Sequence, residues 1–165
     1  MTRELQEKLE SYQRVWAEVD LDAIWENMVH MKENIAEKTK ILAVIKTDGY
    51  GHGGVPIAKM LEQLDFMFGY AAATYEEAHV LREAGVKKPI LILGYTFPYC
   101  YEELIREEIR PAVYRRDTVE ELVAAAAKVG QKAKVHIKVD TGMGRIGITP
   151  DEEGLEFVRF LMGHP

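Results

Sequence analysis

The chain has 165 residues and a formal net charge of −6 at pH 7. This acidic balance argues against nucleic acid or an anionic membrane as a partner, because both attract basic surfaces. A single cysteine excludes a disulfide framework and a multi-cysteine centre, and we expect no metal site. No apolar run approaches the roughly 20 residues of a membrane span, and residues 1–12 lack the apolar stretch of a secretory signal, so the cytoplasm is the expected compartment.

The first elements in chain order are a tail, a helix and a strand. Residues 1–14 are expected to form a helical or extended tail ahead of one domain, residues 15–165. Asp22 is the predicted N-cap of the first helix, which places Ile24, Met28, Met31 and Ile35 on one face. The apolar run at residues 41–46 predicts a buried strand, and residues 55–64 predict a helix with a proline in its first turn.

Four further apolar runs predict strands at residues 66–72, 89–93, 110–114 and 133–139, each short and bounded by Gly, Pro or Asp. Three capping boxes predict helix starts, at Thr74 with Glu77, Asp117 with Glu120, and Thr149 with Glu152. Gly85 and Gly130 are the predicted stops of the helices that precede the third and fifth strands.

A serial strand–helix order with short links predicts parallel strands and right-handed crossovers. Two architectures share this order, a doubly wound open sheet and a (β/α)8 barrel. The doubly wound alternative is weakened because no acidic residue follows the second strand at residues 71–73. We therefore expect an α/β fold with the first five strand–helix units of an incomplete (β/α)8 TIM-type barrel. Unpaired edges on the first and fifth strands predict self-association, a homo-oligomer.

Lys46 ends the first strand and is followed by a glycine-rich loop over residues 48–54. Barrel enzymes place their chemistry at the carboxyl ends of strands, although by position alone a solvated lysine at a strand end is the more common arrangement. Tyr50 and His52 lie in the same loop. Tyr50 could donate a hydrogen bond to a phosphate and His52 could act as an acid or base, or both could pack in a tight turn.

A second group of polar residues follows the fifth strand. Alternation puts Lys138 on the same strand face as Lys134 and His136, where buried cations require an anionic partner. Arg145, on the loop after the strand, could bind a carboxylate with a bidentate fork. Residues 140–142 also read Asp-Thr-Gly, the active-site triplet of aspartic proteases, but a βα setting with one copy argues against that class.

Three stretches carry a resemblance to one family. Residues 43–53 read AVIKTDGYGHG and resemble the cofactor-lysine signature of alanine racemases, with Thr47 and Gly49 in place of two alanines. Residues 138–145 read KVDTGMGR and are similar to the family's K-x-D-T-G-M-G-R. Residues 16–24, WAEVDLDAI, are typical of the start of these enzymes. The three matches occur in order over nearly the whole chain.

The resemblance implies a pyridoxal 5'-phosphate enzyme of the isomerase class that interconverts L- and D-alanine for peptidoglycan precursors. It implies that Lys46 binds the cofactor covalently and acts as one acid–base group, that Tyr50 contacts the cofactor phosphate, and that Arg145 binds the cofactor's phenolic oxygen and the substrate carboxylate. Lys138 matches a position that is carbamylated in many relatives. The opposite base, a tyrosine of the partner subunit's C-terminal domain, is outside this sequence, so we expect the isolated chain to be inactive.

Two other functions remain open from the sequence. The chain could be a non-catalytic half-barrel that assembles with another chain, because the unpaired backbone groups of an open edge strand can bind a strand of that chain. It could also be a racemase of serine or of broad specificity, or a decarboxylase relative that uses the same cofactor. The stretch at residues 50–53, Tyr-Gly-His-Gly, favours the racemases over the decarboxylases.

Overall fold

The computed structural model describes residues 8, 12 and 15–164. The tail predicted for residues 1–14 therefore lies, apart from Lys8 and Tyr12, outside the described residues. The described elements are, in order, α2 Leu21–Glu33, β1 Ile41–Val44, α3 Lys46–Tyr50, α4 Gly54–Leu61, β2 Met67–Ala72, α5 Tyr75–Glu83, β3 Ile90–Ile92, the 3-10 turn η1 Pro98–Cys100, α6 Tyr101–Arg106, β4 Ile109–Val113, α7 Arg116–Val129, β5 His136–Ile137 and α8 Glu152–Met162.

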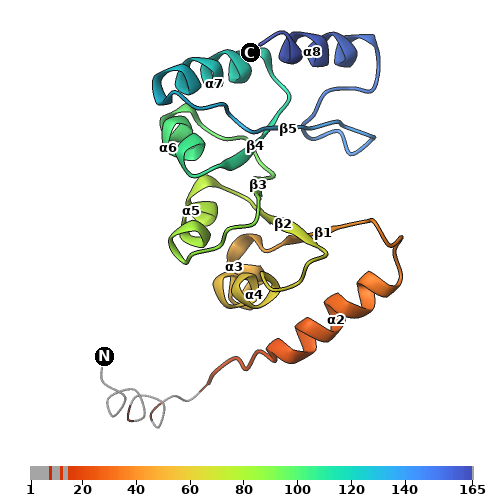
Figure 1. Ribbon diagram of the computed structural model, residues 1–165, viewed down its shortest axis with the longest axis vertical. Helices are drawn as coiled ribbons and strands as arrows, with labels where there is room; N and C mark the ends of the chain where they lie inside the picture. Colours follow the sequence, from red (N-terminus) through yellow and green to blue (C-terminus); the bar gives the residue numbers. More distant parts are fainter. Residues whose placement is uncertain (1–7, 9–11, 13–14, 165) are drawn as a thin grey trace.

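The five strands form one parallel sheet in the order β1-β2-β3-β4-β5 (Figure 1). Each strand pairs with its neighbour in the sequence, whereas a doubly wound sheet reverses its strand order at a switch point. The sheet curls, and α4, α5, α6 and α7 lie along one side of it (Figure 1). This is the wall of part of a TIM-type barrel, as predicted, and β1 and β5 are its edge strands.

The strand register divides the sheet into a helix-covered face and an open face. Residues paired across parallel strands share a face, so Ala43, Tyr70, Ile90 and Ile109 form one row. The last three of these side chains are at most 1 % exposed and belong to the core beneath the helices. The next residue of each strand belongs to the open face, where Val44 is 41 % exposed.

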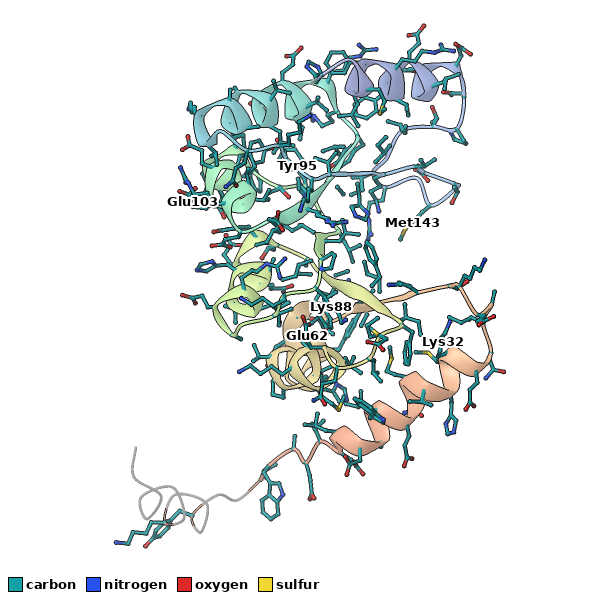
Figure 2. The ribbon with its side chains drawn as sticks, viewed as in Figure 1. Lys32, Glu62, Lys88, Tyr95, Glu103 and Met143 are labelled. Carbon is teal, nitrogen blue, oxygen red and sulfur yellow. The ribbon has the colours of Figure 1, made fainter. Side chains whose placement is uncertain are left out.

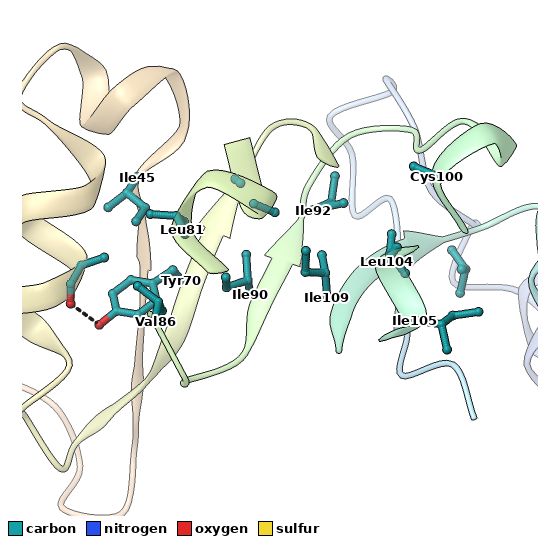
Figure 3. Close-up of a cluster of buried hydrophobic side chains, with 14 of the residues drawn as sticks. Ile45, Tyr70, Leu81, Val86, Ile90, Ile92, Cys100, Leu104, Ile105 and Ile109 are labelled. Carbon is teal, nitrogen blue, oxygen red and sulfur yellow. Dashed lines mark hydrogen bonds between the residues drawn. The ribbon is translucent and has the colours of Figure 1, made fainter. Parts of the chain in front are cut away.

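The core lies between the sheet and the helices, where side chains from β2, β3 and β4 meet those of α4, α5 and α6 (Figure 3). Each large apolar side chain buried there stabilises the fold by about 1.5–3 kcal/mol. Tyr70 carries a hydroxyl group into this layer, and that hydroxyl lies within hydrogen-bond distance of the carbonyl of Ala58, at 2.8 Å, and of the Glu62 carboxylate, at 3.0 Å. The Glu62 carboxylate also accepts the backbone amides of Lys87 and Lys88, which ties α4 to the entry of β3 (Figure 2).

Several helix ends are those that the sequence predicts. Thr74 caps α5 by accepting from the amide of Glu77, Gly130 ends α7 in the left-handed conformation, and Gly85, also at positive φ, follows the end of α5. Pro56 lies in the first turn of α4. Among residues 8, 12 and 15–164, none of the helices has the length and apolarity needed to cross a bilayer.

Three predicted caps are wrong. Helix α2 begins two residues earlier than expected, because Asp20 and not Asp22 accepts from the amide of Ala23. The Asp117 carboxylate binds Arg115 and the amide of Thr118, so the N-cap of α7 is Arg115, without a side-chain cap. Helix α8 starts two residues later than predicted, because Asp151 accepts from Gly154. For α2 and α8, a neighbouring aspartate within the same turn accepts the amide in place of the predicted cap.

Strand β5 is shorter than the predicted residues 133–139. Val113 of β4 accepts from the amide of Lys138 at 3.0 Å, so this edge of β4 faces β5. Pro111, two residues earlier on the same edge, has no N–H to donate, and the ladder cannot extend towards residues 133–135. Beyond Lys138 the chain pairs with Ile148 instead, through a bridge at Val139.

Candidate functional site

Lys46 does not end the first strand as expected: β1 ends at Val44, and Lys46 is the first residue of α3, two positions later at the carboxyl end of the sheet, with a half-buried side chain. Its ammonium is 5.7 Å from the centroid of the Tyr50 ring, a cation–π distance. Tyr50 itself is 59 % exposed, so its hydroxyl is open to a ligand. The structure thus brings two of the predicted site residues together at the end of the barrel where the chemistry was expected.

The backbone between these two residues has an unusual conformation. Thr47, Asp48, Gly49 and Tyr50 have φ of 51°, 52°, 62° and 57°, a full turn in the left-handed region. For residues with a Cβ this region costs about 1–2 kcal/mol each, so single residues adopt it more often than runs. Such strain persists only where surrounding contacts impose it, and it concentrates at functional sites.

Hydrogen bonds from three directions hold the turn. Glu77 of α5 accepts the amide of Thr47 at 2.9 Å, and the Asp48 carboxylate accepts the amide of Gly54, the first residue of α4, at 2.7 Å. The amide of Gly49 donates to the carbonyl of Ile45 at 2.9 Å. A Cβ on Gly49 would stand 3.2 Å from the Gly54 nitrogen, so the loop and α4 are in close contact here.

His52 lies in the same loop, and its Nδ1 is 3.1 Å from the carbonyl of Gly49. The ring therefore participates in closing the turn. Of the two interpretations that the sequence left open for His52, the packing one accounts for this contact.

The polar residues of β5 lie on the open face of the sheet. His136 pairs with Ala112, whereas Ile137 pairs with Val113, which is fully buried on the helix side. Alternation places Lys138 on the His136 side. Burial and the nearby positive charge of Arg110 both lower the pKa of His136.

The open face of β4 and β5 is short of negative charge. The Nε of Arg110 is buried and has no hydrogen-bond partner among the residues that the structure describes. Lys138 forms no salt bridge within residues 15–164, and its charge acts on Asp140 only at longer range. An anion bound on this face would therefore meet two positively charged side chains, Arg110 and Lys138.

Arg145 lies on an exposed loop after β5, and the loop is shaped by Asp140. That carboxylate accepts the amides of Gly142 at 2.9 Å and Gly144 at 3.1 Å, and these bonds lower its pKa. The aspartate of the Asp-Thr-Gly triplet therefore stabilises the loop through hydrogen bonds to its backbone. Met143, 76 % exposed, marks how far the loop reaches on the open side of the sheet, away from the helices (Figure 2).

The structure does not bring all predicted site residues into contact. Lys46 and Tyr50 follow edge strand β1, whereas Lys138 and Arg145 belong to edge strand β5 and its loop, across the curl of the sheet. Sequence reasoning missed two supporting carboxylates. Glu77 was recognised only as part of a capping box and Asp140 only as part of a triplet, although both hold loops that carry site residues.

The donor set has a definite chemical character. A half-buried primary amine can condense with a carbonyl, an exposed tyrosine hydroxyl can donate to a phosphate, and an exposed guanidinium can bind a carboxylate in a fork. These are the groups that an aldehyde cofactor with a phosphate arm and an amino-acid substrate require. The fold brings them from the carboxyl ends of β1 and β5.

Comparison with known proteins points to one family. The model of the family "Alanine racemase, N-terminal domain" matches residues 19–165. Alanine racemase 1 of Oceanobacillus iheyensis is 42 % identical over 155 residues, which are 93 % of this chain and 41 % of that protein. The alanine racemase of Clostridium perfringens is 49 % identical over 144 residues, 87 % of this chain and 37 % of that protein.

Solved structures give the same result. An alanine racemase of Clostridium difficile 630 in complex with cycloserine superposes with a TM-score of 0.90 at 38 % identity, covering 93 % of this chain and 42 % of that one. A histidine racemase of Leuconostoc mesenteroides superposes with a TM-score of 0.79 at 26 % identity, covering 88 % of this chain and 39 % of that one. The chain spans about two fifths of the length of the relatives it matches.

Proposed function

The chain belongs to the alanine racemase family, whose N-terminal domain it matches, and we propose that it carries the cofactor lysine of an enzyme interconverting L- and D-alanine. The observation that carries the proposal is the half-buried Lys46 amine, held beside Tyr50 by a left-handed turn at the carboxyl end of β1. The reaction takes place in the cytoplasm and supplies D-alanine for peptidoglycan precursors.

The proposed cofactor is pyridoxal 5'-phosphate, and the donor set described above fits it. When bound, this group withdraws the electron pair left on the α-carbon after proton loss, which makes that proton labile. Lys46 would hold the cofactor by its side-chain nitrogen, and Tyr50 would donate its hydroxyl hydrogen to the phosphate. Arg145 would bind the cofactor's phenolic oxygen and the substrate carboxylate with its planar fork.

The protein's own task is to move a proton at the α-carbon of the substrate. The Lys46 nitrogen, once free of the cofactor, serves as base and acid on one face of that carbon. Inversion needs a second acid–base group on the opposite face. The proposed source of that group is a partner subunit, in a homodimer, and we expect this 165-residue chain to show no measurable racemisation by itself.

We assign carbamylation to Lys138. The lysine ammonium first loses one proton; the neutral amine then adds carbon dioxide and releases a second proton, so that a cation becomes an anion. On the open face of β4 and β5, the buried Nε of Arg110 has no hydrogen-bond partner and Lys138 forms no salt bridge among residues 15–164, so the new negative charge is attracted to its surroundings. Incubation with 13C-bicarbonate should give a carbamate NMR signal that is absent from Lys138→Ala.

Alanine is favoured as the substrate because the chain is 49 % identical to the alanine racemase of Clostridium perfringens and 26 % identical to the histidine racemase. The alternative of a non-catalytic half-barrel has no observation of its own in its favour. A racemase of broader specificity would show comparable turnover of alanine and serine once the assembled enzyme is assayed.

Cofactor binding is the direct test. The chain is mixed with pyridoxal 5'-phosphate, reduced with borohydride, digested and mapped by mass spectrometry. We expect the label on Lys46, no label there in Lys46→Ala, and normal labelling of Lys46 in Lys59→Ala, a control for an exposed lysine of neighbouring α4. Labelling spread evenly over the surface lysines would contradict the proposal.

A further inference from the structure

The carboxylate of Glu77 joins the ends of two strands. It is half-buried, and it extends from the first turn of α5. One oxygen accepts the amide of Thr47 at 2.9 Å, directly after Lys46, and the other accepts the amide of Ala73 at 2.8 Å, directly after β2. In an ordinary capping box this carboxylate would turn back to the amide of the N-cap, Thr74. Here it binds across to the Lys46 loop instead.

The peptide between Lys46 and Thr47 is held at both of its polar atoms. Its N–H donates to Glu77, and its carbonyl accepts from the Thr47 hydroxyl at 2.7 Å. A peptide fixed on both sides cannot rotate, and it is the first peptide of the left-handed turn. The direction in which the Lys46 side chain leaves the backbone is therefore set by the same contacts that impose the strained φ of Thr47.

The anchor of this arrangement is rigid. Helix α5 packs its buried Ala78 and Leu81 into the core, and Thr74 caps it. A hydrogen bond between an ionised carboxylate and an amide is about twice as strong as a neutral one. Two such bonds from one side chain can offset a left-handed residue that costs about 1–2 kcal/mol. Glu77 supports Thr47 from outside the loop, because its carboxylate accepts the hydrogen bond of the Thr47 amide.

We propose that Glu77 is a positioning residue for Lys46: by fixing the Lys46–Thr47 peptide in the left-handed turn, its carboxylate aims the amine at the cofactor. This inference rests on the proposed function. The substitution Glu77→Gln keeps the size but replaces one acceptor oxygen with an NH2 group, so one of the two amides meets a donor. Glu77→Asp keeps the charge but is too short to reach both amides.

The first test needs no cofactor. In NMR spectra of the chain, the Lys46 ε-methylene protons should be shifted by the ring current of Tyr50, and the Thr47 amide should be protected from solvent exchange. Glu77→Gln should remove both effects. Glu76→Gln, the same change one residue earlier on an exposed side chain that binds Tyr99, should remove neither. An unprotected Thr47 amide in the unmodified chain would overturn the proposal even if both Glu77 variants failed to fold.

The second test measures the rate at which borohydride traps pyridoxal 5'-phosphate on Lys46. We expect Glu77→Gln to slow trapping by about tenfold, the effect of one lost charge-assisted hydrogen bond, and Glu76→Gln to leave it unchanged. Glu77→Asp should lie between the two. An unchanged rate in a folded Glu77→Gln variant refutes the positioning role. If the unmodified chain traps no cofactor, the proposed function fails, while the NMR result still decides whether Glu77 orients Lys46.

Discussion

Three of the four non-glycine residues with positive φ in the described chain are Thr47, Asp48 and Tyr50, immediately after Lys46. The glycines at positions 49, 51 and 53 predict a loop that can enter this region. The sequence does not predict that Thr47 and Asp48 join them. Their conformation depends on hydrogen bonds to Glu77, which belongs to another helix, and to the amide of Gly54, and the sequence of the loop does not reveal either bond. The candidate site residues were predictable from a motif, whereas the contacts that hold this loop were not.

The hydroxyl of Tyr50 gives the first prediction at this scale. Its ring faces the Lys46 amine, and the exposed hydroxyl is the part available to a phosphate. Tyr50→Phe keeps the ring and removes the hydrogen bond, so affinity for pyridoxal 5'-phosphate should fall about tenfold. Titration followed by absorbance measures the change. Affinity for pyridoxal, which has no phosphate, should be the same in both proteins, and an equal loss for both ligands would exclude a phosphate contact.

Cys100 gives a prediction about pH. It is 2 % exposed, and burial, with a smaller effect from the charge of Glu76, raises its pKa from 9.0 to about 11. The thiolate fraction at pH 8 is therefore about a hundredfold lower than in the unfolded chain. Because the folded state holds the proton more tightly, this group's contribution to stability is complete below pH 9 and is lost as the pH rises through 11.

Thiol modification with Ellman's reagent at pH 8 checks this expectation. The native chain should react at least a hundredfold more slowly than the chain in guanidinium, since low accessibility adds to the low thiolate fraction. The denatured sample is its own control for the number of reactive thiols, which is one. Rapid reaction of the folded protein would show that Cys100 is not buried as described.

At the scale of the element, helix starts were harder to predict than strands. All five apolar runs became strands because burial on the helix side leaves few alternatives for a short run of β-branched and aliphatic residues. Caps are decided by which of several nearby oxygens reaches an amide. Near α2 the candidates are Asp20 and Asp22, and near α8 they are Thr149 and Asp151. Each alternative satisfies the same rule, so spacing alone could not select the cap.

Helix α2 provides the corresponding prediction. Asp20 accepts the amide of Ala23 at 3.0 Å, so Asp20→Ala should lower the free energy of unfolding by about 1 kcal/mol, the usual loss for an N-cap. Asp20→Asn should retain most of the stability because asparagine caps equally well. Asp22→Ala removes only a charge in the first turn and should cost less. Urea denaturation followed by circular dichroism measures all three variants, and a larger effect at Asp22 would restore it as the cap.

At the scale of the whole molecule, the fold class was predictable because the order of elements leaves two architectures, a doubly wound sheet and a (β/α)8 barrel. The absence of an acidic residue after the second strand argues against the doubly wound sheet. The strand order, in which each strand joins its neighbour in sequence, then confirms the barrel wall. Its curvature and the faces of individual residues follow from the register, which a sequence pattern does not fix when strands are buried. From the sequence alone, Lys138 could face either the open side of the sheet or the helix layer. The pairing of His136 with Ala112 places it on the open face.

The described sheet ends at β1 and β5, and each edge strand presents backbone groups on one side without a partner strand among residues 15–164. On the open face, Val44 adds an exposed apolar side chain at the β1 edge. Open parallel edges associate, so the 18.8 kDa chain should self-associate in solution.

Sedimentation velocity at rising concentration should give an apparent mass that increases above that of the monomer. A charge at the edge opposes pairing, so Val44→Lys should shift the distribution towards monomer, whereas Val80→Lys should not. Val80, 50 % exposed against 41 % for Val44, is a valine on α5, in the helix layer and away from the edge. If both variants changed the mass alike, association would depend on general surface hydrophobicity, and a chain that stays monomeric at every concentration would show that its edges are protected in another way.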